Sequence, residues 1–350
     1  MTRPFRVGRA LIVAAALACS GCVSAVMAPH IVGAPNQTGR GLRWAETQPE
    51  ARVALARLYA QTFRVPVAGP PATEIAVAVL EPGDYHQRHA FEVRTGPGGK
   101  PAFYLDSHWE PLPDEATREP PRGTLVLLHG FGMSREVVLH WGIRLAQAGY
   151  RTVLVDLRGH GASGGAWVTY GALETADLAA VLDTLQRREL AGPRIGVFGV
   201  SYGGSIGLLW AACDPRVATA VALEPYAEPQ LAIRLYARAV LPRALGRSLS
   251  DGSLRAATRR AARLASFTWS GLDVHEAITG LDRPVFLIHG AADGIIPVDH
   301  SRRLHAAAAA GSRYLEVPGE DHLTLPFRLE GVGDAVAEWF HEHLDAPPAP

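Results

Sequence analysis

The stretch RIGVFGVSYGG, residues 194–204, decides the fold. Residues 194–200 form an apolar run typical of a buried strand, and residues 202–213 have the composition of a buried helix. Ser201 therefore lies on a sharp turn directly between a strand and a helix. Such a turn exposes the serine hydroxyl, and the flanking glycines let the chain pass without Cβ clashes. This context indicates a nucleophilic serine.

The bare pattern G-x-S-x-G does not choose this serine, because it occurs three times in the chain. Ser205 lies one helical turn after Ser201, inside the same helix, where a small packing residue is expected. Ser163 lies in a Gly-rich loop with no strand directly before it, and we interpret it as a loop residue near the site. Ser201 alone combines the preceding strand with the following helix.

Outward from this turn, apolar strands alternate with helical segments. Continuous apolar runs without polar alternation are typical of parallel strands that are covered on both faces. The sequence therefore predicts an α/β fold with a mostly parallel central sheet, helices on both faces, and chemistry beyond the carboxyl ends of the strands. The expected strands are 124–128, 152–157, 194–200, 217–223, 284–289 and 313–317, and the expected helices include 173–190 and 202–213.

The segments outside this repeat have other patterns. Residues 224–283 are rich in Ala, Leu and Arg and have no strand pattern, which predicts a helical lid over the carboxyl edge of the sheet. Residues 23–72 are interrupted by Pro and Gly, and we expect a tether and an N-terminal helical extension with one helix around 49–63. Three further strands, expected at 74–80, 89–94 and 100–106, suggest an antiparallel edge.

Three segments in order carry a family resemblance: LLHGFG (127–132), DLRGHGASGG (156–165) and GVSYGG (199–204). With them the chain resembles the α/β-hydrolase superfamily from about Glu74 to Leu344. The resemblance implies an α/β-hydrolase domain over residues 73–345, with the lid at about 224–283. The three motifs together are specific for the superfamily, but they do not select one activity within it.

The resemblance also implies a catalytic triad in the order serine, acid, histidine. His322 lies in the loop where the fold delivers its base, whereas His341 and His343 lie in a helix-like stretch and are expected at the surface. Asp293 follows the strand at 284–289, the usual place for the acid, where it would orient the imidazole. Glu224 ends the strand at 217–223 and is the alternative acid, because some family members place the acid there.

Two backbone N–H groups, those of Phe131 and Tyr202, are implied as the oxyanion hole. The sequence has no HExxH motif and no other His/Asp cluster with the spacing of metal ligands, so no metal is expected. The glycines at 159–165 do not open a helix with the dinucleotide fingerprint, nor do they precede a phosphate-binding lysine. No cofactor is therefore expected.

The N-terminus has the features of a targeting segment. Three arginines precede an apolar run at 10–18, which is too short to span a bilayer as a mature helix. Small residues follow, and a lipoprotein-type signal peptide over residues 1–22 is expected, with Cys22 as the acylated residue and Cys19 as the alternative. A cleaved secretion signal also stays open. The expected location is the bacterial cell envelope, with a lipid anchor in the membrane.

These features together favour a serine hydrolase that cleaves small or medium acyl esters through an acyl-enzyme intermediate. Thioesterase, lysophospholipase, peptidase and cofactor-free haloperoxidase activities use the same triad and stay open. A non-catalytic lipoprotein binding module is the alternative from another class. The chain has 34 basic and 34 acidic residues, so its charge does not favour nucleic acid as a partner. The sequence does not indicate an oligomeric state.

Overall fold

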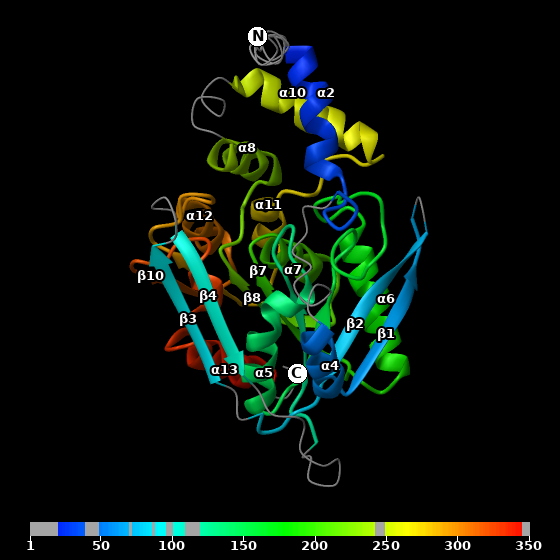
Figure 1. The fold of residues 1–350 in the computed structure, drawn as a ribbon, viewed down its shortest axis with the longest axis vertical. Coiled ribbons are helices and arrows are strands. Elements are labelled where there is room, and N and C mark those ends of the chain that lie inside the picture. The colour runs from blue at the N-terminus through cyan, green and yellow to red at the C-terminus, as the bar shows by residue number, and fades with distance from the viewer. Residues whose placement is uncertain are drawn as a thin grey trace, which may run out of the picture.

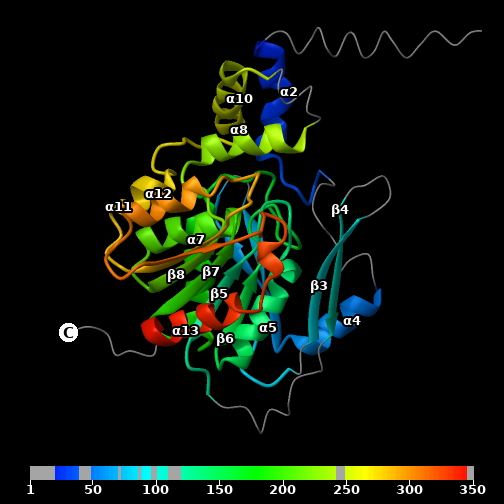
Figure 2. The same cartoon turned by 90° about the vertical axis from the view of Figure 1, so that its left-hand side faces the viewer.

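The computed structural model describes residues 20–38, 49–69, 72–85, 88–95, 101–108, 120–241 and 249–344. At its centre is an eight-stranded sheet with the strand order β1-β2-β6-β5-β7-β8-β9-β10 (Figures 1 and 2). Strands β5 to β10 are parallel to one another, whereas β1 and β2 run antiparallel at one edge. The strands are β1 (Gln61–Val67), β2 (Thr73–Leu80), β5 (Thr124–Leu128), β6 (Arg151–Val155), β7 (Ile195–Val200), β8 (Val217–Leu223), β9 (Val285–Gly290) and β10 (Arg313–Val317).

Helices cover both faces of this sheet. One apolar core lies between the sheet and helices α6, α7, α11 and α12, and a second lies between the sheet and α4, α5 and α13. Every residue of β5, β7, β8 and β9 is buried, which explains their unbroken apolar sequences. The helices are α4 (Pro49–Leu58), α5 (Leu139–Gln147), α6 (Glu174–Arg187), α7 (Tyr202–Cys213), α11 (Val274–Thr279), α12 (Asp299–Ala307) and α13 (Val332–Leu344); η3 (Arg135–Val138) and η4 (Leu325–Phe327) are short 3₁₀ helices.

The N-terminal part of the sheet corrects two expectations. The helix expected around 49–63 ends at Leu58, and the residues after it form β1. The strand is stabilised there because Val65 and Val67, on one of its faces, are buried in the core. The antiparallel edge consists of β1 and β2. Strands β3 (Arg88–Thr95) and β4 (Pro101–His108) pair only with each other among the described strands and form a separate ribbon (Figure 2).

Within the part of the chain that the structure describes, three helices form a cap beyond the carboxyl ends of the strands (Figures 1 and 2). Two of them, α8 (Pro229–Val240) and α10 (Asp251–Leu264), come from the expected lid segment. The third is α2 (Ser20–Val32), which packs against α10 although it lies in the region expected to be partly tether. Helix α11, which also belongs to the expected lid segment, instead packs against α7 and α12 beside the sheet. Within the described ranges, no helix is both long and apolar enough to cross a bilayer.

Candidate active site

The turn between β7 and α7 places Ser201 in a strained backbone conformation. Its φ is 51° and its ψ is −111°, a region that non-glycine residues rarely adopt. The strain costs about 1–3 kcal/mol and persists only where the surrounding structure enforces it. Here the Ser201 N–H donates to the Leu223 carbonyl at 2.7 Å, at the end of the neighbouring strand β8. The turn is therefore fixed to the sheet, with the hydroxyl at its tip.

The two glycines of the Gly199–Gly203 motif are required by close backbone approach. A Cβ at Gly199 would lie 2.4 Å from the Gly203 carbonyl oxygen, and one at Gly203 would lie 2.5 Å from the carbonyl oxygens of Leu128 and His129. Such distances are far below van der Waals contact, so any side chain would open the turn. The motif at Ser201 thus has a steric origin in the packing of α7 against β7 and β5.

Ser201, His322 and Asp293 form a continuous hydrogen-bonded chain. Ser201 Oγ lies 3.0 Å from His322 Nε2, and His322 Nδ1 lies 2.7 Å from Asp293 Oδ2. Because a carboxylate can only accept, the Nδ1–H donates to Asp293, which leaves Nε2 free to accept the Ser201 proton. The three residues come from loops after β7, β9 and β10, at the same edge of the sheet. The structure thus brings these three expected residues together.

Several donors surround the Asp293 carboxylate. The Ile295 and Ile296 N–H groups both donate to Oδ1 at 2.8 Å, and His289 Nε2 lies 3.2 Å from Oδ2. Burial alone would raise the pKa of Asp293, but the hydrogen bonds from His289 and His322 outweigh it and hold that pKa well below its usual range. Asp293 is therefore charged at neutral pH.

Glu224, the alternative acid, also lies beside His322. Its Oε2 is 3.5 Å from His322 Nδ1, a longer contact than the 2.7 Å of Asp293. The Glu224 side chain is fully buried, and neither carboxyl oxygen makes a hydrogen bond of normal distance and angle with a described residue. Burial and the neighbouring charge of Asp293 raise the pKa of Glu224 well above its ordinary value. The backbone of Gly290 is close enough to oppose part of the rise in the pKa of Glu224. By this geometry Asp293 is the acid partner of His322, and Glu224 is a more distant neighbour whose protonated form is favoured by burial.

The loop after β5 brings Phe131 over the nucleophile turn. The Phe131 ring makes edge contacts with the rings of His160, Tyr202 and Tyr236, at centroid distances of 5.7, 5.8 and 6.2 Å. Tyr236 belongs to α8, so this contact joins the cap to the site. No described backbone group accepts the Phe131 N–H, and Tyr202, the first residue of α7, has no helical carbonyl partner for its N–H. Both expected oxyanion donors are thus without a backbone acceptor in the described part of the chain.

Glu174 supports Tyr202 and was not found from the sequence. The Tyr202 hydroxyl donates to Glu174 Oε1 at 2.9 Å, while Thr169 and Gly171 supply three further donors to the same buried carboxylate. This arrangement fixes the residue that follows Ser201. Glu174 stands at the start of a helix, where acidic residues are common, and nothing in its spacing distinguishes it from such residues.

The other two serines of the G-x-S-x-G pattern have structural hydrogen bonds. The Ser163 hydroxyl donates to the Asp156 carbonyl at 2.6 Å and accepts the Ala76 N–H at 2.8 Å, which ties the Gly-rich loop to β2. Ser205 is fully buried and accepts the Tyr226 N–H at 2.9 Å. Both agree with their interpretation from the sequence.

The remaining titratable residues of the site region have structural partners. Asp321 accepts the Leu323 and Thr324 N–H groups and so caps its own turn. His341 and His343 are partly buried, where the sequence had suggested surface positions: His341 contacts the Tyr150 hydroxyl, and His343 stacks on Trp339. These contacts of His341 and His343 do not involve Ser201, Asp293 or His322.

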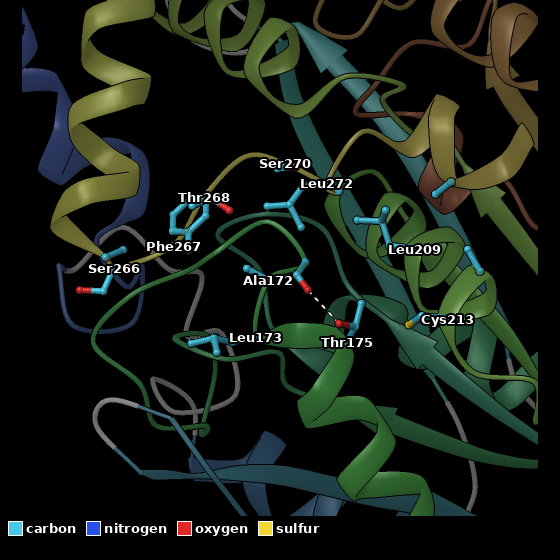
Figure 3. Close-up of a pocket in the computed structure, with 15 residues that line it drawn as sticks. Ala172, Leu173, Thr175, Leu209, Cys213, Ser266, Phe267, Thr268, Ser270 and Leu272 are labelled. Atoms are coloured by element: carbon cyan, nitrogen blue, oxygen red, sulfur yellow. Dashed lines mark hydrogen bonds between the residues drawn. The ribbon is translucent and has the colours of Figure 1, made fainter. Parts of the chain in front are cut away.

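A cavity of about 710 Å³ lies away from the Ser201 turn (Figure 3). Its walls are the start of α6, the end of α7 and the segment 265–272, and Ser201, Asp293 and His322 do not line it. The labelled side chains come from these elements, and a hydrogen bond from Thr175 to the Gly171 carbonyl closes one wall (Figure 3). Cys213 is the sole thiol in the lining, and no chemistry follows from it.

Glu224, Asp293 and His322 each offer one ligand atom within 4.8 Å of the others, a spacing that could hold a metal ion. However, His322 already uses Nδ1 toward Asp293 and Nε2 toward Ser201. A metal bound here would have to displace the contact between the histidine and the serine. The donor set therefore fits a proton-transfer site better than a metal site.

A family model described as alpha/beta hydrolase fold matches residues 123–277, which include the Ser201 turn. The solved structure of a Pyrococcus furiosus esterase superposes with a TM-score of 0.57 at 19% identity, covering 83% of this chain and 93% of that one. The chain has the α/β-hydrolase fold. Its sheet order, its helices on both faces and its cap confirm the fold class expected from the sequence.

Two curated proteins illustrate the sequence similarity of this chain to known proteins. An uncharacterized protein of Bacillus subtilis is 30% identical over 186 residues, 52% of this chain; the match spans 59% of that protein, less than two thirds of its length. An Escherichia coli protein named as an esterase is 28% identical over 244 residues, which is 65% of this chain and 91% of that protein. The chain is thus similar to a named esterase over most of that esterase's length.

Of the two cysteines considered for acylation, Cys22 lies near the start of α2 and is exposed, whereas the next residue, Val23, is buried. Cys19 and most of the expected signal peptide lie outside the described residues. The division of the chain at residues 22, 72 and 345 stays a prediction.

Proposed function

We propose that this protein is a serine hydrolase that cleaves carboxylic esters through an acyl-enzyme intermediate. The observation that carries the proposal is the chain of two hydrogen bonds from Ser201 Oγ to His322 and from His322 to Asp293, at 3.0 and 2.7 Å. A serine hydroxyl is a weak nucleophile at neutral pH, and an adjacent imidazole of the correct tautomer activates it. The similarity to the Escherichia coli esterase supports the same reaction class.

In the proposed acylation step, Ser201 Oγ attacks the ester carbonyl carbon while its proton moves to His322 Nε2. The imidazolium that forms is stabilised by the charged Asp293. The tetrahedral intermediate then collapses: the carbon–oxygen bond to the alcohol breaks, and His322 returns the proton to the departing alkoxide. Water repeats the sequence on the acyl-enzyme, with His322 again accepting a proton, and releases the acid.

The negative oxygen of this intermediate needs donors that are already in place. The N–H groups of Phe131 and Tyr202 are the proposed donors, since neither has a described backbone acceptor. The bond from Tyr202 to the buried Glu174 fixes the second of them. Preorganised donors of this kind contribute about 3–4 kcal/mol each to lowering the barrier of acyl transfer.

A fluorophosphonate probe tests the proposal directly, because it phosphonylates an activated serine irrespective of the acyl specificity. We expect the native protein to be labelled at Ser201, as identified by peptide mass spectrometry. p-Nitrophenyl esters, thioesters and anilides of matched acyl groups then separate esterase, thioesterase and peptidase activity. Absence of labelling in the folded native protein would contradict the mechanism and leave a binding module as the better account.

The contact between Phe131 and Tyr236 leads to a prediction about acyl length. The Phe131 ring contacts Tyr202, the residue after Ser201, and Tyr236 contacts the Phe131 ring from the cap. We propose that the two rings limit the acyl group to small or medium size. Tyr236→Ala removes the cap's part of this wall. The ratio of kcat/KM for a dodecanoate ester to that for a butyrate ester should rise by about tenfold or more, as expected for a change of pocket size.

The control for this prediction is Leu264→Ala, because Leu264 is also an exposed apolar residue of the cap but lies on α10. Leu264→Ala should have the same ratio of kcat/KM for the dodecanoate ester to kcat/KM for the butyrate ester as the native protein. An unchanged ratio in Tyr236→Ala would show that the cap does not limit the acyl group at this point.

We also propose that the protein is a lipoprotein of the bacterial cell envelope, acylated at Cys22. Its exposure at the start of α2 leaves room for a lipid on the sulfur, while Val23 anchors the helix to the cap. Cells grown with an alkyne fatty acid should incorporate the label into the protein, and Cys22→Ser should lose it completely, together with its membrane association. Loss of the label in Cys19→Ser instead would reassign the site, and an unlabelled native protein would contradict the lipoprotein proposal.

A further inference from the structure

The unusual feature next to the proposed triad is that two carboxyl groups face one histidine nitrogen. Asp293 Oδ2 lies 2.7 Å and Glu224 Oε2 lies 3.5 Å from His322 Nδ1. The two acids come from different strands, since Asp293 follows β9 and Glu224 directly follows β8. Both carboxyl groups are fully buried at their side chains. The site therefore contains one more acid than a triad requires.

The backbone at Glu224 is also unusual. Its φ of 52° lies in the left-handed region, which a residue with a long side chain rarely occupies. The Glu224 N–H donates to the Ile288 carbonyl at 2.7 Å and so fixes this conformation against β9. The preceding residue, Leu223, accepts the Ser201 N–H. The strained backbone thus aims the Glu224 side chain at His322 from the same strand end that holds the nucleophile turn.

The hydrogen-bond donors at this site are divided unequally between the two acids. Asp293 accepts from two backbone N–H groups and from His322, with His289 nearby. The Glu224 oxygens make no hydrogen bond of normal geometry with a described residue and have only the Gly290 backbone beside them. A buried carboxylate without donors is costly, while a protonated carboxyl group is not. Two acids this close share a single negative charge, and the donors place that charge on Asp293.

We propose that Glu224 is a second positioning residue for His322, which holds a proton while Asp293 is charged and takes over the negative charge when Asp293 is neutralised. The proposal rests on the proposed function, in which His322 is the general base. The titratable groups facing Glu224 are Asp293 from the β9 loop, and Glu320, Asp321 and His322 from the loop after β10. The three acids oppose its ionisation, and removal of the charge of Asp293 relieves the largest of these repulsions.

The test is a cycle of conservative variants. In Asp293→Asn the amide cannot stabilise the imidazolium, but Glu224 can ionise and accept the Nδ1–H of His322 in its place. We expect kcat/KM to fall by about 10²-fold in Asp293→Asn and by about 10⁴-fold in Asp293→Asn/Glu224→Gln, the loss typical of a triad without its acid. Glu224→Gln alone should cost less than about tenfold, because Asp293 remains. The loss of kcat/KM in the double variant is therefore larger than the product of the losses in the two single variants, and this difference measures how far Glu224 replaces Asp293.

The pH profile separates this role from a purely structural one. Activity of Asp293→Asn should rise with pH along one ionisation that is absent from the double variant, because Glu224 must lose its proton to the solvent before it can pair with His322. The matched control is Asp293→Asn/Glu320→Gln. Glu320 is a buried acid of the same region, but it pairs with Arg328. This control should keep the ionisation that the Asp293→Asn/Glu224→Gln variant loses, and that ionisation should move to lower pH because one of the opposing charges is removed.

Two readouts do not depend on activity. Folding of the native chain takes up a proton at Glu224, because its pKa in the folded state is raised. The free energy of unfolding should therefore fall as pH rises above about 4.5, the ordinary value for Glu, relative to Glu224→Gln, which carries no charge. Difference infrared spectra should also show the carbonyl stretch of a protonated carboxylic acid that Glu224→Gln removes.

Equal activity of Asp293→Asn and the double variant, in a protein whose Ser201 reacts with the fluorophosphonate probe, would overturn the role of Glu224 and leave the hydrolase intact. A native protein without the carboxylic-acid band would also overturn it. Failure of Ser201 to react in the native protein would instead contradict the proposed function itself. The two failures are thus distinguishable.

Discussion

Ser201→Ala should lower kcat for ester hydrolysis by about 10⁴- to 10⁶-fold and abolish labelling by the fluorophosphonate probe. The variant removes a single oxygen, the only atom that would bond to the acyl carbon. It leaves the backbone of the turn in place, because the hydrogen bond to the Leu223 carbonyl involves the main chain. Substrate binding should change little, so KM should move by much less than kcat. Steady-state kinetics with a short-chain p-nitrophenyl ester measures both.

Two controls come from the chain's own repeated motif. Ser163→Ala and Ser205→Ala remove serines of the same G-x-S-x-G pattern, but their hydroxyls bond to backbone groups away from His322. Both should keep most of the activity and all of the labelling. Ser205→Ala leaves the Tyr226 N–H without its acceptor and should cost about 1–3 kcal/mol of stability, visible as a lower Tm. If Ser163→Ala abolished turnover in a folded protein, the choice of Ser201 would be wrong.

The sheet and the Ser201 turn could be predicted because their physical causes are local. A strand buried on both faces must be apolar throughout, and a tight passage from β7 to α7 must have glycine where a Cβ would meet a carbonyl. These requirements are visible in residues 194–204 without knowledge of distant contacts. The choice of Asp293 and His322 came from the resemblance to the α/β-hydrolase superfamily, and the parallel strands explain why residues that follow them meet at one edge of the sheet.

The cap and the separate ribbon could not be predicted in the same way. Helix α2 has no polar face that would reveal its partner, and its place against α10 depends on a contact between distant segments of the chain. The ribbon of β3 and β4 has the pattern of any antiparallel pair, so the sequence could not separate it from the main sheet. Long-range packing overrides local patterns in both cases.

Glu174 and Glu224 show which properties of the site could not be predicted from the sequence. Glu224 was recognised as a rival to Asp293, but its burial without donors is a property of the packed structure. Glu174 was not recognised at all, because its role depends on Thr169, Gly171 and Tyr202 converging around it. A sequence position indicates which strand end carries an acid, whereas the charge of that acid depends on the donors around it.

His322→Ala should cost as much as Ser201→Ala, about 10⁴- to 10⁶-fold in kcat, because the hydroxyl loses its proton acceptor and the leaving alcohol loses its proton donor. The double variant should be no slower than either single one. Ser201 and His322 act as one unit, so removing either of them already removes the contribution of both. The remaining activity would come from the oxyanion donors and from substrate binding, which neither substitution changes. Kinetics of the three variants with one ester, at matched folded fractions, measures this. A further loss of several orders of magnitude in the double variant would mean that Ser201 reacts without His322, and another base would then have to be sought.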